Sequence, residues 1–321
     1  MFQKELSDQY EVALQRQILK VFHASGLRLH DNHLGSKVFS NYQRIALIVL
    51  FQRSGKALRN FVSELKESKW PRWLGLRDIP SYRTIHHWLT YWSVSWVRKV
   101  LRTTVIHKQP SCMAVDATGF DSWQRSRHYE KRIGAAPMPY AKADLLVDTE
   151  ERLIYDFVLR MKPQHDTLGA KTMISRSSVR DVLILADKGY DSEPLHEQVA
   201  ASGNMLYAPV RKSSRKSPHG HHRRRCARGN KLYHQRNIVE SINFSLKSRF
   251  RSLRSKKHWM KKREFGWKLI TYNLEKLSQE VYSLLKSLFR KFILNRAGGG
   301  SISAGKKLGS AGGVVRLEPL T

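Results

Sequence analysis

Residues 181–191 read Asp-Val-Leu-Ile-Leu-Ala-Asp-Lys-Gly-Tyr-Asp, and this stretch decides the fold class. The continuous apolar run that ends at Ala186 predicts a strand buried on both faces, as in the parallel part of an α/β sheet. Asp187 follows that run directly. Because open α/β sheets carry their functional groups at the carboxyl ends of strands, Asp187 is a candidate site residue.

The segments on either side of this stretch predict a mixed α/β sheet with flanking helices. Short apolar runs indicate strands, and longer amphipathic runs indicate helices. We expect further strands over 112–120, 141–147, 153–159 and 204–210, and helices over 166–177 and 192–201. The polar stretch Asp148-Thr149-Glu150-Glu151 predicts a hairpin turn. Three strands followed by helix, strand, helix and strand form one α/β domain.

The first hundred residues have the periodicity of helices instead. An apolar stripe predicts the first helix, through Tyr10, Leu14, Ile18 and Phe22. Residues 42–52 and 58–65 predict two helices joined at Ser54-Gly55. This outline is that of a helix-turn-helix, which binds DNA in many proteins. A helical bundle without DNA contact is the alternative.

A last N-terminal helix is expected after a loop marked by Pro71, Gly75 and Pro80. Ser81 is the candidate N-cap of this helix. Its apolar stripe consists of Ile85, Trp88, Leu89, Trp92 and Trp96.

The charge balance favours a polyanionic partner. The 321 residues include 58 Lys+Arg and 26 Asp+Glu, which gives a formal net charge of +32 at pH 7. Residues 211–263 contain nineteen of the basic residues and a single acid, Glu240. The commonest polyanion that relieves such self-repulsion is nucleic acid. The hydrophobic content of 41% is enough for real cores, which excludes a disordered tail protein.

Other protein classes are excluded by what the chain lacks. Two cysteines, Cys112 and Cys226, are too few for a disulfide framework and suit a reducing cytoplasm. The longest apolar run, residues 45–51, is far shorter than the roughly 20 residues that span a bilayer. The first residues have no signal-peptide core. We therefore expect a cytoplasmic protein without a membrane partner.

Three acids are candidates for chemistry by their positions. Asp116 lies in the strand Met-Ala-Val-Asp-Ala-Thr-Gly, Asp187 ends another strand, and Glu240 stands alone in the basic segment. Three carboxylates on a sheet and an adjacent helix can bind two Mg²⁺ ions, with Mn²⁺ as a substitute, for phosphodiester cleavage. Surrounding cations would hold the DNA backbone. The alternative for Glu240 is a surface ion pair.

The spacing around Glu240 is more specific. Tyr233, Arg236, Glu240 and Lys247 form Tyr-x2-Arg-x3-Glu-x6-Lys. At about 100° per residue, all four would share one helical face if the helix extended back to Tyr233. An acid flanked by phosphate-binding cations is what cleavage of a polyanion requires. The alternative is an ordinary amphipathic helix packed by Ile238, Ile242 and Leu246, with its polar residues solvated.

These residues resemble the DDE transposases of prokaryotic insertion sequences, in the branch with the Tyr-Arg-Glu-Lys signature. The resemblance spans roughly residues 112–275 and also includes the pair His165-Asp166. It implies a ribonuclease H-like catalytic fold. It also implies that Asp116, Asp187 and Glu240 are catalytic metal ligands. The 53 residues from Asp187 to Glu240 leave no room for the large inserted β-domain of longer relatives.

The resemblance further implies that Tyr233, Arg236 and Lys247 contact DNA at the transposon end. The expected reaction is metal-dependent cleavage at the end of the element, which leaves a 3′-OH that attacks target DNA. Transposon ends and target DNA are thus the expected partners. We also expect a homodimer on DNA and association with the nucleoid.

The chain is expected to divide into three parts. Residues 1–105 would form a helical, helix-turn-helix-like domain, and residues 106–290 the ribonuclease H-like catalytic domain. Residues 291–321 are Gly- and Ser-rich and are expected to be a disordered tail. The Gly-x4-Gly-Lys match at residues 300–306 lacks the following Ser or Thr, which argues against nucleotide binding.

Several polar and aromatic residues have two interpretations. Asp166 and Asp191 are expected to cap helices rather than act at the site, and Asp148 belongs to a turn. Asp144 is a candidate to join the carboxylates. The tract His219, His221, His222 and Cys226 favours a flexible DNA-contacting loop over a zinc site. Trp259 and Trp267 would be either core residues or platforms for a flipped base.

Two other functions compete with transposition. The first is a catalytically inactive DNA-binding relic or regulator, which would keep the basic surface without the chemistry. The second is a basic RNA-binding protein, which would not need Asp116, Asp187 and Glu240 to converge. If the chain is an enzyme of this kind, the three carboxylates should lie within about 4 to 8 Å of one another, so that they can share two metal ions.

Overall fold

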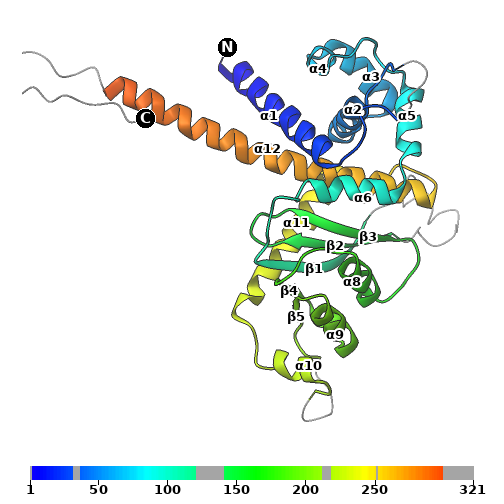
Figure 1. Ribbon diagram of the computed structural model, residues 1–321, viewed down its shortest axis with the longest axis vertical. Coiled ribbons are helices and arrows are strands. Elements are labelled where there is room, and N and C mark those ends of the chain that lie inside the picture. Colours follow the sequence, from blue (N-terminus) through cyan, green and yellow to red (C-terminus); the bar gives the residue numbers. More distant parts are fainter. Residues whose placement is uncertain (1, 32–36, 121–140, 212–217, 251, 299–321) are drawn as a thin grey trace, which may run out of the picture. The chain divides into compact units, whose positions relative to one another are not determined.

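The computed structural model of the protein describes residues 2–31, 37–120, 141–211, 218–250 and 252–298 (Figure 1). Residues Met1–Gln279 form one compact unit, and Glu280–Thr321 form a second. The sheet and all helices before α12 belong to the first unit. None of the helices in the described part of the chain is long and apolar enough to cross a membrane.

The N-terminal third is helical, as predicted from the sequence. Leu14, Ile18 and Phe22 of the expected stripe are buried, while Tyr10 is half-buried. The helices are α1 (Phe2–Ala24), α2 (Asn41–Ser54), α3 (Leu58–Glu67), α4 (Trp70–Trp73), α5 (Tyr82–Tyr91) and α6 (Val94–Thr103).

The turn between α2 and α3 is built as the sequence indicated. Gly55 ends α2 with a φ of 63°, a left-handed conformation that favours glycine. Ser40 begins the same helix with a capping box, because its hydroxyl accepts from the Gln43 N–H while the Gln43 side chain accepts from the Ser40 N–H. These caps fix both ends of α2 independently of its packing.

The helix that we expected from Ser81 to Trp96 is two helices. Ser81 caps α5 as predicted, but the chain becomes extended at Trp92 and Ser93. Ser93 then caps α6 through the Trp96 N–H. The single apolar stripe was misleading because Trp92 is buried after α5 has ended, whereas Trp96 on α6 is 39% exposed.

The sheet has five strands in the order β3-β2-β1-β4-β5. Strand β1 pairs antiparallel with β2 and parallel with β4, while β2–β3 is antiparallel and β4–β5 parallel. This is the expected ribonuclease H-like mixed sheet. The strands are β1 (Cys112–Gly119), β2 (Lys142–Asp148), β3 (Ile154–Arg160), β4 (Leu183–Ala186) and β5 (Met205–Tyr207).

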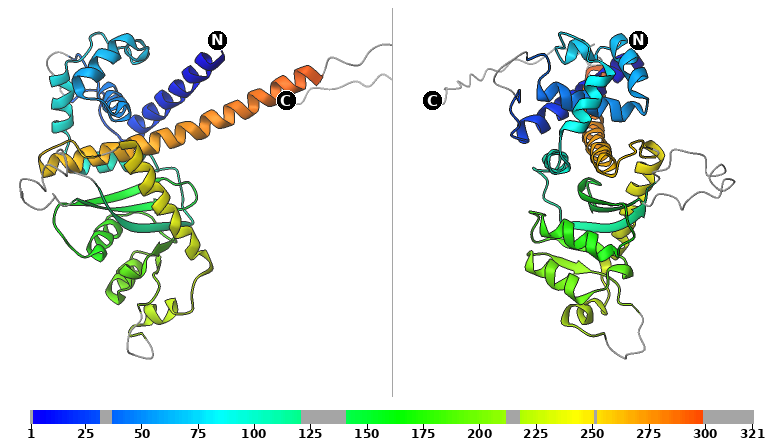
Figure 2. Two further views of the ribbon diagram at one scale, coloured as in Figure 1. Left: turned by 180° about the vertical axis from the view of Figure 1, so that it is seen from behind. Right: turned by 90° about the vertical axis from the view of Figure 1, so that its right-hand side faces the viewer.

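Helices cover both faces of the sheet (Figures 1 and 2). One core joins α6, α11 and the start of α12 to residues such as Ala114, Leu145 and Leu185. The other core joins α8 and α9 to Met113, Val115 and neighbours. These helices are α8 (Asp166–Ser175), α9 (Glu193–Ala201), α11 (Asn237–Phe250) and α12 (His258–Gly298).

Alternate residues of β1 therefore face opposite layers, as a strand requires. The N-terminal helices share the first of these cores, so the helical third and the α11 side of the sheet are packed as one body. Trp92 and Trp267 meet there, with ring centroids 5.4 Å apart.

Helix α12 crosses the boundary predicted at residue 290. It continues to Gly298, so residues 291–298 are helical. Residues 299–321, which include the Gly-x4-Gly-Lys match, lie outside the described residues. The division of the chain at residues 105 and 290 stays a prediction.

Candidate active site

Asp116 lies within β1, and Asp187 follows the last residue of the adjacent parallel strand β4. Strands β1 and β4 pair Ala114 with Leu185 and Val115 with Ala186. Asp187 continues β4 in an extended conformation, with φ −74° and ψ 172°. The register therefore places Asp116 beside Asp187, on the face that Ala114 and Leu185 turn toward α11.

Glu240 lies on α11, the helix that covers this face. Val239, Ile242 and Leu246 of the helix are buried in the core that contains Ala114 and Leu185. The Glu240 side chain is 57% exposed, and its Oε1 accepts from Nη2 of Arg236 at 2.5 Å. The surface ion pair that the sequence left open is therefore present.

The pKa of Asp116 is raised from its usual value. Burial is the main cause, and the charges of Asp187 and Glu240 raise it further. The Ala117 N–H and the Arg236 guanidinium act in the opposite direction.

The remaining two residues of the signature are placed differently. Tyr233 lies in a 3₁₀ helix, η2 (Lys231–Arg236), that precedes α11, so the expected continuous α-helical face does not extend back to it. Its ring packs edge-on against Tyr207 with centroids 5.4 Å apart. Lys247 is exposed on α11 and has no ion-pair partner among the residues that the structure describes.

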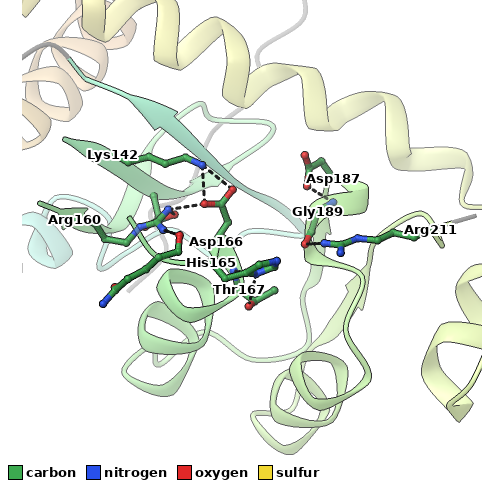
Figure 3. A network of polar contacts seen from close by, with 10 residues as sticks. Lys142, Arg160, His165, Asp166, Thr167, Asp187, Gly189 and Arg211 are labelled. Carbon is green, nitrogen blue, oxygen red and sulfur yellow. Dashed lines mark hydrogen bonds and ion pairs between the residues drawn. The ribbon is translucent and has the colours of Figure 1, made fainter. Parts of the chain in front are cut away.

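An ion-pair network lies on the other face of the sheet, which α8 covers (Figure 3). Arg160 ends β3 and holds Asp144 with two bonds of 2.7 Å, from Nε and Nη2. The same Nη2 donates to Asp166, which also binds Lys142 at 2.7 Å. Asp144 is fully buried, and burial raises its pKa to about 6 despite the contact with Arg160.

The network corrects two interpretations of the sequence. Asp166 does not cap α8, because His165 is the N-cap and its Nδ1 accepts from the Thr167 N–H at 3.4 Å. Asp166 is instead the first residue of α8, and ion pairs with Lys142 and Arg160 lower its pKa although burial opposes this. Asp144 serves the network rather than the carboxylate group at Asp116.

The loop after β4 is held by arginines from a later part of the chain. Asp187 Oδ1 accepts from the Gly189 N–H at 2.7 Å and so caps the 3₁₀ turn η1 (Lys188–Tyr190). Arg211 donates to the carbonyl oxygens of Lys188 and Gly189 (Figure 3). The backbone next to Asp187 is therefore fixed from both sides.

Asp191 was expected to cap the next helix but does not. Its carboxylate binds Arg223 at 2.6 and 2.7 Å and accepts from the Arg211 N–H. These bonds lower its pKa, against the effect of burial. Asp148, by contrast, accepts from the N–H groups of Glu150 and Glu151, which confirms the predicted hairpin turn.

Tyr190 is completely buried beneath this loop. Its hydroxyl has no hydrogen-bond partner among the residues that the structure describes. Burial raises its pKa, and the nearby charges of Asp144 and Asp116 raise it further. The Tyr190 ring belongs to the core on the α8 side of the sheet.

The remaining candidates divide between surface and core. Trp267 is fully buried and is a core residue, whereas Trp259 is 43% exposed with the guanidinium of Arg263 4.6 Å from its ring centroid. The His/Cys tract forms a short helix, α10 (His221–Cys226), where we expected a flexible loop. Its His222 ring stacks on buried His196, with centroids 6.0 Å apart.

The donor atoms at the strand ends are carboxylate oxygens, the type that Mg²⁺ prefers. A divalent cation would also relieve the repulsion that raises the pKa of Asp116. Within the described part of the chain, no three His, Cys, Asp or Glu side chains are gathered as a ready metal site. The convergence of all three acids within metal-binding distance stays a prediction.

Comparison with known proteins assigns the family. Residues 107–274 match the family model described as the transposase DDE domain, which is more than half of the chain. The chain belongs to the DDE transposase family. The matched region contains all five strands of this transposase and ends within α12.

Solved structures give weaker similarities. The transposase is similar to the piggyBac transposase synaptic complex with hairpin DNA, with 10% identity and a TM-score of 0.41, over 87% of this chain and 79% of that one. It is also similar to a pre-cleavage Mos1 transpososome, with 12% identity and a TM-score of 0.25, over 82% and 84%. No curated protein matches significantly in sequence. The assignment therefore rests on the family model.

Sequence reasoning missed the arginines that organise this transposase. Arg160, Arg211 and Arg223 each bind an acid or a backbone carbonyl near the strand ends. Only the position of Arg160, at the end of a strand next to His165-Asp166, gave a signal in the sequence. Arg211 and Arg223 lie in a basic run, where no single arginine stands out.

Proposed function

We propose that this transposase cleaves DNA at the ends of an insertion sequence and joins the resulting 3′-OH to target DNA. The observation that carries the proposal is the parallel register of β1 and β4, which brings Asp116 and Asp187 onto neighbouring strands on the face that α11, the helix with Glu240, covers. The net charge of +32 supports DNA as the substrate.

Asp116, Asp187 and Glu240 would hold the divalent ions, Mg²⁺ with Mn²⁺ as a substitute. Bound there, such ions supply Lewis acidity toward a phosphoryl oxygen and a nucleophile at neutral pH. Glu240 is exposed and held by one guanidinium, so its carboxylate has room for a second cation. Asp187 is already oriented by the Gly189 N–H.

The cationic residues of α11 and η2 would hold the DNA backbone. Arg236 and Lys247 flank Glu240 along the chain, and Lys247 is exposed. Electrostatic contacts of this kind position a phosphate without reading sequence. Tyr233 would add a contact at the transposon end. The proposed active form is a homodimer on DNA.

The test is Mg²⁺-dependent cleavage of DNA that carries the element's own flanking ends. Glu240→Gln should lower the cleavage rate by at least about 100-fold, because even outer partners of metal ligands contribute about 10- to 100-fold. DNA affinity, measured by fluorescence anisotropy without Mg²⁺, should change little. Glu197→Gln, an exposed acid on α9, is the matched control and should cleave normally.

Each outcome separates the two candidate functions. If the wild type and Glu197→Gln cleave the DNA and Glu240→Gln does not, the result supports the enzyme. Binding without cleavage by all three proteins would support an inactive DNA-binding relic or regulator, which the exposed cations of α11 would still serve. Equal cleavage by Glu240→Gln and the wild type would contradict the role assigned to Glu240.

A further inference from the structure

Phe244 is an apolar side chain in an unusual position. It is 74% exposed, more than any other large hydrophobic side chain that the structure describes. At about 100° per residue, it lies about 160° from Ile242 and from Leu246, which point into the core. No rotation of its side chain can bury it against the protein's own sheet.

The same geometry places Phe244 on the face of the candidate active site. It lies about 40° from Glu240 and about 60° from Lys247 around the axis of α11, one turn from each. Val239, the neighbour of Glu240, is buried in the core that contains Ala114 of β1 and Leu185 of β4, so the start of α11 lies against the strands that carry the two aspartates. An exposed aromatic ring thus stands between a candidate metal ligand and a candidate phosphate contact.

The surroundings of Phe244 are polar. Ser241 and Ser248 on α11 are exposed, and Ser245 is half-buried. Docking surfaces for proteins contain contiguous apolar patches, which this part of α11 lacks. An isolated aromatic ring with a lysine one turn away matches the way proteins bind unpaired nucleotides, with the base stacked on the ring and the phosphate on the cation.

We propose that Phe244 stacks on an unpaired nucleobase of the DNA, next to the phosphodiester at the carboxylates. This inference rests on the proposed function, since it takes DNA as the ligand. Stacking tolerates any base because every base has a π face, so Phe244 would hold the strand without selecting sequence. Lys247 would hold the phosphate of the same strand.

The experiment compares two DNA probes in the absence of Mg²⁺. One is a duplex with a single-stranded extension that contains 2-aminopurine, and the other is the same duplex with blunt ends. Phe244→Ala should bind the extended duplex about 5- to 150-fold more weakly than the wild type and should no longer quench the 2-aminopurine fluorescence. Phe244→Trp should keep both properties, and blunt duplex should bind all variants alike.

Met205→Ala is the matched control, because Met205 is 45% exposed on the edge strand β5. It should behave as the wild type on both probes. Phe244→Ala should also unfold at the wild-type temperature, since its side chain makes few contacts with the protein.

Three results would overturn the inference: unchanged quenching by Phe244→Ala, an equal loss on both probes, or a shift in the oligomeric state of the free protein. The last result, seen by sedimentation velocity, would assign Phe244 to an interface with a second copy. Mg²⁺-dependent cleavage by the wild type is scored separately. Its absence would refute the proposed function even if the quenching depends on Phe244.

Discussion

Replacing Arg160 with methionine should destabilise the protein through the carboxylate that it leaves behind. Asp144 is fully buried and receives two bonds of 2.7 Å from Arg160. Removing one partner of such a pair costs about 3–5 kcal/mol. The carboxyl can escape part of this cost by taking up a proton. At pH 7, and from a usual pKa of 3.8, that route costs about 4 kcal/mol.

The loss should depend on pH in a defined direction. Burial raises the pKa of Asp144 to about 6 in the wild type, so its contribution to stability is present below pH 3.8 and is lost as pH rises through about 6. Without Arg160 the pKa rises further. The free energy of unfolding of Arg160→Met should therefore keep falling above pH 6, by up to about 1.4 kcal/mol per pH unit, while that of the wild type no longer responds to this group.

Urea unfolding between about pH 6 and 8, in buffer with a chelator, measures both effects. The double variant Arg160→Met/Asp144→Asn has no carboxyl at position 144. Its free energy of unfolding should therefore not fall between about pH 6 and 8, and it should be more stable than Arg160→Met at pH 8. The reasoning would be refuted by equal slopes in Arg160→Met and the wild type, or by a double variant no more stable than the single one.

Two further predictions concern α12 in the first compact unit. Burial raises the pKa of Glu275 to about 7 from 4.5, although Arg249 and Arg53 oppose this, so its contribution to stability is lost as pH rises through about 7. Glu275→Gln should remove up to about 3 kcal/mol of that decline in urea unfolding between about pH 5 and 8, and an unchanged slope would contradict the assignment. Gly266→Ala should lower the free energy of unfolding by about 1–3 kcal/mol, because the new Cβ would lie 2.5 Å from Val97 Cγ1 and 3.0 Å from Phe157 Cζ. A higher melting temperature would instead show that the helix-propensity gain of about 1 kcal/mol outweighs the clash.

The strands and helices could be predicted because their signals are local. The stripe through Leu14, Ile18 and Phe22 needs only a period of 3.6 residues, and the apolar run before Asp187 needs only its neighbours. The break at Trp92–Ser93 could not be predicted in this way. Ser93 starts a new helix here, and the residue before it, Trp92, packs against Trp267 of a distant helix. That contact between distant residues is not visible in the local sequence.

The positions of the acids could be predicted better than their partners. Asp116 and Asp187 were found because each lies at or near a strand end. The partner of Asp191 is Arg223, which is 32 residues away in a run of three arginines. Which of those arginines turns inward depends on the start of α10, where Glu193 accepts from the N–H groups of His222 and Arg223. No local pattern encodes that choice.

The acids near this end of the sheet fall into two groups by what surrounds them. An arginine binds each of three acids, namely Asp144, Asp166 and Asp191. These ion pairs hold β3, α8 and the loop after β4 in place. Asp116 and Asp187 have no ion-pair partner among the residues that the structure describes, and the Asp187 carboxylate accepts from the Gly189 N–H.

This division explains why the arginines matter to the site. Burial is the main cause of the raised pKa of Asp116, and the charges of Asp187 and Glu240 add to it because no ion-pair partner neutralises them at Asp116. Arg160 and Arg223 bind the surrounding acids, and Arg211 binds backbone carbonyls. These arginines are therefore not available to pair with Asp116 or Asp187. If an arginine were freed, for example by replacing Asp191, it would be expected to compete with a divalent ion for Asp187. If the two aspartates bind a metal ion as proposed, these structural ion pairs keep the arginines away from them.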